Sequence, residues 1–521
     1  MAAFLGLDPE ASAGTADALA AQVRALAVIV SEVDATSAVA LTQVFRTSPG
    51  ETGMSPYSRS LLASAGALLR TARANADGLI ERLRGEIQAQ ANASGNAGYF
   101  DSAGGWVSEA ITAEAFTGLD ADEVAAMWAR LGDPLHPLEA TPAQLALLER
   151  HPELFGNLDG IPFTHRDIAN NIMLDDFEAA IAVIDAESRR LIDAGDFDGY
   201  FEFLSANGHD AGTVFAARES IAGIRASLVA SASATSQLVT LVVGPPVLAG
   251  VSIGNLDTAT QVTINVPGMG TTVAGSMEEW TRASDNLYRE QRKQNELYRP
   301  EESLAVVSWI GYDTPRQAMQ GYVDVLSSER AIVGGDSLAS LLEGITAARG
   351  WAPGENLSVV AHSYGTTTAA FAVAQTPVEN LTLLASAGLD RSVSTVGDLM
   401  VDADRVWASE AEGDWVADLG RGNYSVQEFG GRVQWSGAWF YDHPVNPTEE
   451  LFGGQVFSSE DSVANGVPLE GSDWHSVAPQ VSADVTGEST DQYGYLDSGT
   501  TPLRNTALTS IGLGDHVVSS R

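Results

Sequence analysis

The chain has 521 residues, of which 45% are hydrophobic and 18% charged. This balance is typical of a globular protein, and the length exceeds that of one average domain. The formal net charge of -40 argues against nucleic acid and an anionic membrane surface as partners, because their phosphates would be repelled. The sequence contains no cysteine, which excludes disulfides, a thiol nucleophile and cysteine-ligated zinc.

The sequence has no recognisable targeting segment. Met1–Glu10 lacks a basic segment followed by an apolar one, so a cleaved signal peptide is not expected. The most apolar stretch, Leu238–Val251, is interrupted by Pro245-Pro246 and is too short to cross a bilayer, so no membrane span is expected. The sequence leaves undecided whether the protein is cytoplasmic or exported without a cleaved signal.

Residues 1–96 are predicted to form a helical hairpin. Apolar residues recur with helical spacing on both sides of the Gly- and Pro-containing loop Thr47–Pro56. The pattern resembles the WXG-type helical hairpins of specialised secretion substrates, although the Trp-x-Gly at the bend is missing. A packing or dimerising hairpin is the simpler interpretation, and it makes a homodimer through these helices a candidate assembly.

Two further regions are predicted after the hairpin. Residues 97–234 continue in a helical pattern and are expected to pack on the domain that follows, and the isolated His151 and His165 are expected at the surface or at helix caps. No metal-ligand spacing is visible. From residue 235 the pattern alternates between strands and helices, which predicts parallel crossovers and a doubly wound sheet. The predicted strands are Leu238–Val243, Gln261–Val266, Leu304–Ile310, Leu357–Ala361, Leu381–Ala385 and Arg405–Ala408, with helices near 276–295, 316–325 and 336–348.

The segment Leu357-Ser-Val-Val-Ala-His-Ser-Tyr-Gly365 predicts a strand, a sharp turn at Ser363 and a helix. Small residues at Ala361 and Gly365 would let the strand and the helix approach closely. This pattern resembles the nucleophile elbow of α/β-hydrolases, with Ala361 in place of the usual first glycine. An ordinary strand-to-helix turn is the alternative interpretation.

Other segments match a family signature that runs through most of the chain after residue 97. They are Pro152-Glu-Leu-Phe-Gly-Asn-Leu-Asp-Gly-Ile-Pro162, Arg166-Asp-Ile-Ala-Asn170, Gly254-Asn-Leu-Asp-Thr-Ala259, Val266-Pro-Gly-Met-Gly-Thr-Thr272, Trp309-Ile-Gly-Tyr-Asp-Thr-Pro315, Phe452-Gly-Gly454 and Gly494-Tyr-Leu-Asp-Ser-Gly-Thr-Thr-Pro-Leu-Arg-Asn505. The chain thereby resembles a largely uncharacterised actinobacterial α/β-hydrolase family of the Ser-His-Asp type with a helical N-terminal region. The resemblance implies an α/β-hydrolase fold for residues 235–521, a small-molecule or peptide ester or amide as substrate, and no metal or organic cofactor.

A serine nucleophile needs a carboxylate to orient its histidine base, and α/β-hydrolases carry these groups in the chain order Ser, acid, His. Asp414 is expected in the loop after a strand, and the family commonly has an Asp, an apolar residue and Val at this point, which Asp414-Trp-Val416 fits. Asp390, after the preceding strand, is the competing acid. A surface carboxylate with no role is the remaining alternative in so acidic a chain.

Three histidines follow Asp414, namely His443, His475 and His516. His516 lies five residues from the C-terminus, where fraying is common. The resembled family carries its histidine after Phe452-Gly-Gly and before Gly-Tyr-Leu-Asp, and this interval contains His475. We therefore predict His475 as the base.

One departure from the family pattern bears on the base. Family members hold the histidine closer to Gly-Tyr-Leu, where Glu488 or an uncharged residue stands in this chain. A degenerate hydrolase scaffold is therefore the alternative function. In that case the protein would be a non-catalytic interaction or secretion-associated protein.

An oxyanion hole needs two backbone N–H donors, one from the residue after the nucleophile and one from a loop after an earlier strand. These are predicted to be Tyr364 and Met269, with Gly268 or Gly270 close to the second donor. A plain glycine-rich turn is the alternative, and a phosphate-binding loop is not expected because no lysine follows the glycines. The neighbour of the nucleophile, His362, is not the predicted base, because adjacent residues of the turn point in different directions. The aromatic candidates to line an acyl pocket are Trp309, Tyr312, Trp415 and Trp474.

Overall fold

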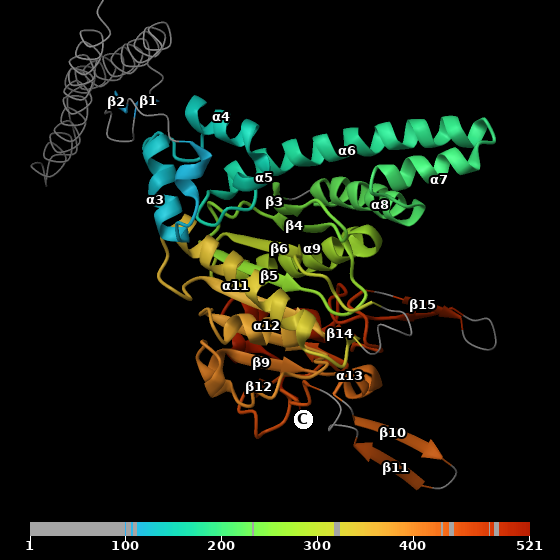
Figure 1. Cartoon of the computed structure of the whole chain (residues 1–521). Helices are drawn as coiled ribbons and strands as arrows, with labels where there is room; N and C mark the ends of the chain where they lie inside the picture. Colours follow the sequence, from blue (N-terminus) through green and yellow to red (C-terminus); the bar gives the residue numbers. More distant parts are fainter. Residues whose placement is uncertain are drawn as a thin grey trace, which may run out of the picture. The chain divides into compact units, whose positions relative to one another are not determined.

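The computed structural model (Figure 1) describes residues 99–100, 106–107, 112–231, 234–316, 324–421, 423–428, 431–436, 442–478, 480–483 and 489–520. The described residues do not include residues 1–96, for which the hairpin was predicted. They also do not include Glu488. The chain divides into two compact units, Met1–Gly118 with Ala126–Leu147, and Leu119–Ala125 with Leu148–Arg521. The three predicted domains and the homodimer through the hairpin stay predictions.

The larger unit is built on a mostly parallel sheet of eight strands in the order β12-β9-β8-β7-β5-β6-β4-β3. The central strands are continuous runs of buried residues, as expected for a sheet covered on both faces. The bounds are β3 Ser236–Val242, β4 Leu248–Ile253, β5 Gln261–Val266, β6 Leu304–Ile310, β7 Leu357–His362, β8 Asn380–Leu384, β9 Val406–Ser409 and β12 Gln455–Val456. The six predicted strands are therefore present, with shifts of at most two residues at their ends.

Two strands of this sheet, the edge strand β12 and the internal strand β4, were not predicted from the sequence. β4 lies antiparallel between β6 and β3, so β3 and β4 form a hairpin at one side of an otherwise parallel sheet. Gly250 on β4 lies against Trp309 of β6: a Cβ at this glycine would come within 3.3 Å of the tryptophan ring. A short apolar run that contains a glycine and follows two prolines is a weak strand signal, so neighbouring strands rather than local propensity define β4.

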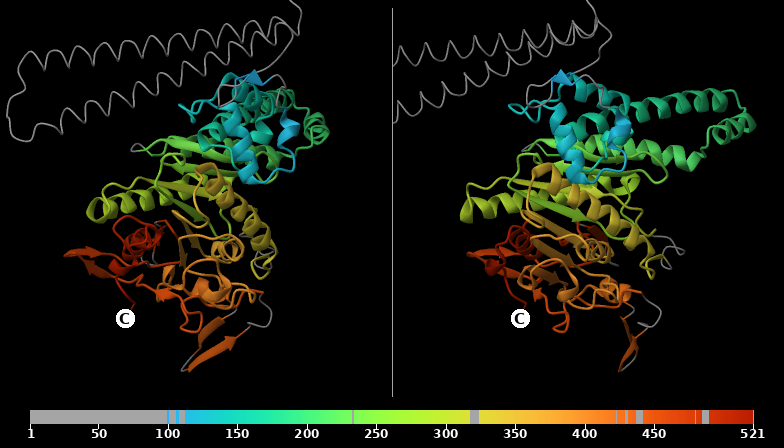
Figure 2. Two further views of the ribbon diagram at one scale, coloured as in Figure 1. Left: turned by 90° about the vertical axis from the view of Figure 1, so that its left-hand side faces the viewer. Right: turned by 60° about the vertical axis from the view of Figure 1, so that its left-hand side comes forward.

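Helices cover both faces of the sheet (Figure 2). The helices on one face are α11 Glu329–Arg349 and α12 Gly365–Val373, and those on the other are α8 Ala211–Leu228, α9 Val273–Tyr298 and α14 Thr501–Ser510. Each face has its own hydrophobic cluster, one centred on β5, β7 and α11 and the other on α9 and α14. The predicted helices near 276–295 and 336–348 are thus α9 and α11, whereas most of the third prediction, 316–325, lies outside the described residues.

The segment predicted as helix, loop and helix forms α5 (Pro152–Phe155) and α6 (Phe163–Asp193). Its polar side chains pair with the outer edge of β3. Asn157 bonds both the N–H and the carbonyl of Leu241, and Asn170 donates to the carbonyl of Leu238 at 2.8 Å. These hydrogen bonds satisfy backbone N–H and C=O groups of the edge strand β3 that could otherwise pair with another strand. His165 is fully buried in α6, so its expected surface position is wrong.

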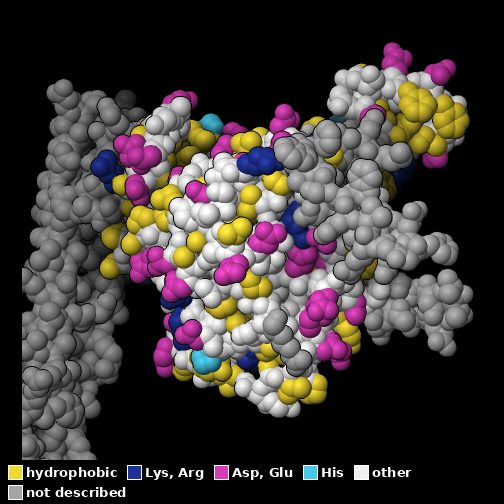
Figure 3. Space-filling view, turned by 90° about the horizontal axis from the view of Figure 1, so that it is seen from below, with side chains coloured by type: hydrophobic (Ala, Val, Ile, Leu, Met, Phe, Trp, Pro, Cys, Tyr) yellow, Lys and Arg dark blue, Asp and Glu magenta, His cyan; other side chains and the backbone are white. Residues whose placement is uncertain are grey.

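The remaining described elements are mostly small. The helices are η2 Ala113–Phe116, α3 Ala121–Leu131, α4 Pro142–Arg150, α7 Phe197–Ala206, η3 Val396–Asp398, η4 Ala403–Arg405, α13 Trp415–Gly420 and η6 Gly514–His516. The strands form the hairpins β1 Tyr99–Phe100 with β2 Trp106–Val107, β10 Asn423–Glu428 with β11 Gly431–Ser436, β13 Ser462–Ala464 with β14 Val467–Leu469, and β15 Gln480–Ala483 with β16 Ser489–Gln492. Acidic side chains are spread over the face in Figure 3. Among the described helices, none combines the length and the hydropathy that a bilayer span requires.

Candidate active site

Ser363 occupies the sharp turn between β7 and α12. Its φ of 57° lies in the left-handed region, which a residue with a side chain rarely adopts and which is a form of local strain common at functional sites. The turn is possible because Gly365 has no side chain: a Cβ there would lie 2.4 Å from the carbonyl oxygen of Pro267. β7 and α12 thus approach the end of β5 closely, at the carboxyl edge of the sheet, as the sequence predicts for a nucleophile elbow.

Two distant segments bring the other predicted residues to Ser363. His475 Nε2 lies 2.7 Å from Ser363 Oγ, and His475 Nδ1 lies 2.8 and 2.9 Å from the two carboxylate oxygens of Asp414. A carboxylate can only accept, so Nδ1 carries the hydrogen and Nε2 is left to accept from the serine hydroxyl. In an arrangement of this kind an imidazole can act as a base toward a serine hydroxyl.

Asp414 is held as an anion within the protein. It begins α13, where its carboxylate accepts from the N–H of Ala417, and its side chain is fully buried. Burial by itself raises the pKa of a carboxyl group. Hydrogen bonds from His475, Ala417 and Tyr495, together with the charge of His475, outweigh it and keep the pKa of Asp414 below its ordinary value.

The glycine-rich loop after β5 lies against the nucleophile. A Cβ on Gly268 would lie 2.6 Å from the Cβ of Ser363 and 3.1 Å from its Oγ. Within the described residues, neither the N–H of Met269 nor that of Tyr364 donates to another part of the protein. Both amides predicted for an oxyanion hole are thus unpaired, and the loop of one of them touches Ser363.

The competing residues are occupied elsewhere. Asp390 accepts from Ser328 and Ser392. His443 is fully buried, with its two ring nitrogens 2.9 and 2.6 Å from the carbonyl oxygens of Ala387 and Val325. Its ring therefore has no nitrogen left for a serine.

The last histidine and the four aromatic candidates lie in different surroundings. His516 stacks on Tyr298 near the end of the chain. Trp309 and Tyr312 are buried and stack on each other, so they belong to the core. Trp415 and Trp474 are instead the neighbours of Asp414 and His475, and their rings meet edge to face at 5.9 Å. Trp415 is 55% exposed, which leaves this pair as the candidate for substrate contact.

His362 lies beneath the site as a neutral ring. It contacts the rings of His475 and Tyr495, with centroids 4.9 and 5.7 Å away. Burial, with a further contribution from the charge of His475, lowers the pKa of His362 to about 3. His362 is therefore uncharged at neutral pH.

This buried neutral histidine predicts a specific acid sensitivity. The pKa in the folded protein is below the unfolded value of 6.5, so the unfolded state binds the extra proton between pH 6.5 and 3. His362 therefore stabilises the fold fully above pH 6.5 and loses that contribution, as much as about 5 kcal/mol, as the pH falls toward 3. In His362→Leu, the melting temperature should fall less steeply between pH 7 and 4 than in the wild type. The exposed His136→Leu is the control, and equal slopes in wild type and His362→Leu would contradict the prediction.

The sequence analysis missed two residues that support the site. Tyr495 donates a hydrogen bond from its hydroxyl to Asp414 at 2.9 Å, and it is the tyrosine of the Gly-Tyr-Leu-Asp signature, which was the available signal. Arg421 is buried below α13 and contacts Glu410 through two hydrogen bonds of 2.7 and 2.8 Å. It also donates to the carbonyl of Ser386, beside the nucleophile turn. The pairing of Arg421 with Glu410 could not be read from the sequence, because nothing distinguishes these residues from other charged ones.

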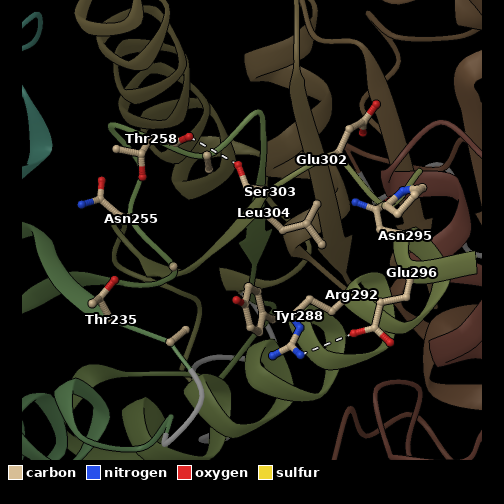
Figure 4. A pocket seen from close by; sticks show the side chains of 14 residues that line it. Thr235, Asn255, Thr258, Tyr288, Arg292, Asn295, Glu296, Glu302, Ser303 and Leu304 are labelled. Carbon is tan, nitrogen blue, oxygen red and sulfur yellow. Dashed lines mark hydrogen bonds and ion pairs between the residues drawn. The ribbon is translucent and has the colours of Figure 1, made fainter. Parts of the chain in front are cut away.

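A separate pocket of about 430 Å³ lies at the opposite edge of the sheet, near the amino ends of β5 and β6 (Figure 4). Tyr288, Arg292 and Asn295 of α9 line it together with Ser303, and Arg292 forms an ion pair of 3.5 Å with Glu296. Its lining contains no histidine, so it offers no serine-histidine pair. We therefore place the candidate active site at Ser363. Among the described residues, no cluster of His, Asp and Glu side chains is arranged to hold a metal ion.

Residues 245–423 match the sequence model of the Abhydrolase_8 family, described as alpha/beta hydrolase. The chain carries an alpha/beta hydrolase domain. The match confirms the predicted α/β-hydrolase fold class and supports a hydrolase. The match includes the nucleophile turn and Asp414, while His475 lies beyond it.

Two relatives from Mycobacterium tuberculosis, the uncharacterized proteins MT2140 and Rv2079, are each 27% identical over 285 residues. The alignment covers 53% of this chain and 42% of each relative, so the chain spans less than half of their length. Similar solved structures include esterase PE8 (12% identity, TM-score 0.23, 33% of this chain and 77% of that one) and XC6422 from Xanthomonas campestris, a serine hydrolase without a lid (18%, 0.23, 35% and 73%). These structural likenesses are too low to carry an argument about function.

Proposed function

We propose that the protein is a serine hydrolase that cleaves an ester or amide through an acyl-enzyme intermediate. Ser363 is the nucleophile, His475 the base and Asp414 the orienting acid. The observation that carries the proposal is the continuous chain of hydrogen bonds from Ser363 Oγ through the His475 ring to the buried Asp414 carboxylate. The buried His443, by contrast, has both ring nitrogens on backbone carbonyl oxygens and contacts neither a serine nor a carboxylate through them.

In the first half of the reaction, Ser363 Oγ attacks the substrate carbonyl carbon while its proton moves to His475 Nε2. The negative charge that develops on the carbonyl oxygen is stabilised by the N–H groups of Tyr364 and Met269. His475 then gives the proton to the departing alcohol or amine. The carboxylate of Asp414 stabilises the imidazolium during this step without taking the proton itself.

In the second half, a water molecule replaces the leaving group. His475 takes a proton from this water as it attacks the acyl-enzyme, and returns the proton to Ser363 as the ester breaks. The same three side chains and two amides thus serve both halves of the cycle. The acyl chain would lie near Trp415 and Trp474, which adjoin the acid and the base in sequence and contact each other.

The direct test is covalent labelling with a fluorophosphonate probe, which reacts with an activated serine. Labelling of the folded chain, with the modified peptide mapped to Ser363 by mass spectrometry, is the expected result. A screen with paired ester and amide substrates would then separate an esterase from a peptidase or amidase. If the folded protein is not labelled, the alternative stands, namely a non-catalytic interaction or secretion-associated protein on a degenerate hydrolase scaffold.

The oxyanion loop gives a further prediction. Gly268→Ala would place a methyl group 2.6 Å from the Ser363 Cβ and 2.9 Å from the His362 carbonyl oxygen, so the loop must move away. A displacement of about 1 Å at a reacting group costs on the order of 100-fold in rate, and we expect a loss of labelling rate of that size. Gly397→Ala, with 3.5 Å to its nearest neighbour, is the matched control. An unchanged rate in a correctly folded Gly268→Ala would remove this loop from the mechanism.

A further inference from the structure

Tyr495 is a buried side chain whose hydroxyl group lies between two fixed partners. Its oxygen is 2.8 Å from the backbone nitrogen of Ala411 and 2.9 Å from Asp414 Oδ2. The N–H of Ala411 can only donate, so the hydroxyl oxygen accepts there and its single hydrogen points at Asp414. The ring has no exposed surface. The direction of this hydrogen bond therefore follows from the chemistry of its partners.

We propose that Tyr495 is a positioning residue of the hydrolytic site: its hydroxyl holds the Asp414 carboxylate in the orientation that His475 requires. This inference rests on the proposed function. His475 Nδ1 lies almost equally far from the two Asp414 oxygens, at 2.8 and 2.9 Å. One of these oxygens is held by the N–H of Ala417 and the other by Tyr495. Without Tyr495, the carboxylate would be held on one side only and could rotate about its bond to Cβ.

The backbone around Tyr495 ties the acid to the loop of the base. The N–H of Tyr495 donates to the carbonyl of Ser476, the residue after His475, at 2.9 Å. Gly494 permits this approach, because a Cβ there would lie 2.5 Å from the carbonyl carbon of Val477. One residue therefore contacts the acid through its side chain and the loop of the base through its backbone.

The charged and titratable groups around this hydroxyl are Asp414, Glu410, His362 and His475. Glu410 is paired with Arg421, and His362 is neutral as described above. Burial, followed by the negative charge of Asp414, raises the pKa of Tyr495 well above 10. The phenol therefore remains protonated and remains a donor over the whole range in which a serine hydrolase works.

The test compares Tyr495→Phe with the wild type by the rate of fluorophosphonate labelling as a function of pH. A hydrogen bond to a charged group is lost, so the plateau rate should fall about 10-fold. The carboxylate of Asp414 loses a donor, so it binds a proton more readily and also stabilises the His475 imidazolium more strongly. Both effects move the acidic limb of the labelling profile to higher pH, a change that a general loss of stability does not produce.

A second variant keeps the hydroxyl of Tyr495 and changes only its strength as a hydrogen-bond donor. Incorporation of 3-fluorotyrosine at position 495 makes the phenol a stronger donor, so the acidic limb should move in the opposite direction, to lower pH. Thr509→Val, which removes a buried hydrogen bond of 2.8 Å between β8 and α14, is the control for lost hydrogen bonding away from the site. In an Asp414→Ala background, which removes the acceptor, Tyr495→Phe should cause no further loss, because the two residues act through the same contact.

The outcomes separate this inference from the proposed function. The wild type is labelled if the hydrolase proposal holds. If both Tyr495 variants then show the same acidic limb and the same plateau rate of labelling as the wild type, the positioning role is wrong while the hydrolase proposal stands. Equal rate losses for Tyr495→Phe in the wild-type and Asp414→Ala backgrounds would likewise overturn it. If wild type itself is not labelled, the hydrolase proposal fails, and the positioning role fails with it.

Discussion

Replacement of Ser363 by alanine should abolish both covalent labelling and hydrolysis. The alanine has no atom to form the acyl bond, and the loss of such a nucleophile reduces turnover by on the order of 10⁶-fold. The fold should survive, because the substitution removes only one oxygen atom from a small buried side chain. The measurement is labelling intensity together with the initial rate on the best substrate from the ester and amide screen.

The matched control for this variant is Ser358→Ala on β7, the strand that precedes the turn of Ser363. Ser358 is buried like Ser363, but its hydroxyl accepts from Asn380 at 3.0 Å, away from the site. Its replacement should leave labelling unchanged. Labelling that persists in Ser363→Ala would show that the probe reacts at another residue.

Replacement of His475 by alanine should lower the rate of labelling by at least about 10⁴-fold, because no other group takes the proton of Ser363. The neighbouring His362 does not substitute, since its pKa of about 3 makes it a poor base. Added imidazole should partly restore the rate by occupying the space that the side chain leaves. Second-order labelling rates with and without imidazole measure both effects.

His516→Ala and His443→Ala test the other two candidates for the base. His516 stacks on Tyr298, and its loss should not change labelling. His443→Ala is expected to reduce stability, because two buried carbonyl groups would lose their partner. Labelling that survived in His475→Ala but disappeared in a folded His516→Ala or His443→Ala would reassign the base.

The alternation of strands and helices was predictable because each central strand is buried on both faces. Every residue of β5 and β6 is buried, and the bounds of both strands match the sequence prediction. β4 was not predictable in this way, since its antiparallel place depends on β3 and β6 rather than on its own residues. The long helix α6 contributes another feature that only the structure reveals, because its Asn170 pairs with the edge strand β3, 68 residues away.

The residues of the candidate site also differ in how far the sequence alone could predict them. Ser363 could be identified locally, because a strained turn between a buried strand and a helix needs small neighbours, and those neighbours are adjacent in sequence. Asp414 and His475 followed from chain order and from a family resemblance, so their assignment depended on distances along the chain. His475 lies 19 residues before Gly494, farther than the resembled family places its histidine from Gly-Tyr-Leu.

The structure explains that separation. β15 and β16 form an antiparallel hairpin between His475 and Gly494 and return the chain to its starting point. Asp473 and Tyr493 are therefore joined by a backbone hydrogen bond of 3.0 Å across the base of the hairpin. The hairpin lengthens the chain between His475 and Gly494 without separating the two ends in space.

The amino-acid sequence by itself determined the class of fold, the nucleophile turn and a short set of candidate acids and bases, because these depend on periodicity and on neighbours within a few residues. The tertiary structure decided which carboxylate and which histidine face Ser363, because hydrogen bonds of 2.7 to 2.9 Å depend on how β7, α13 and the loop of His475 meet. It also decided the environment of Tyr495 and His362. Burial and the direction of a hydrogen bond are properties of the packed protein, and no local pattern of residues encodes them.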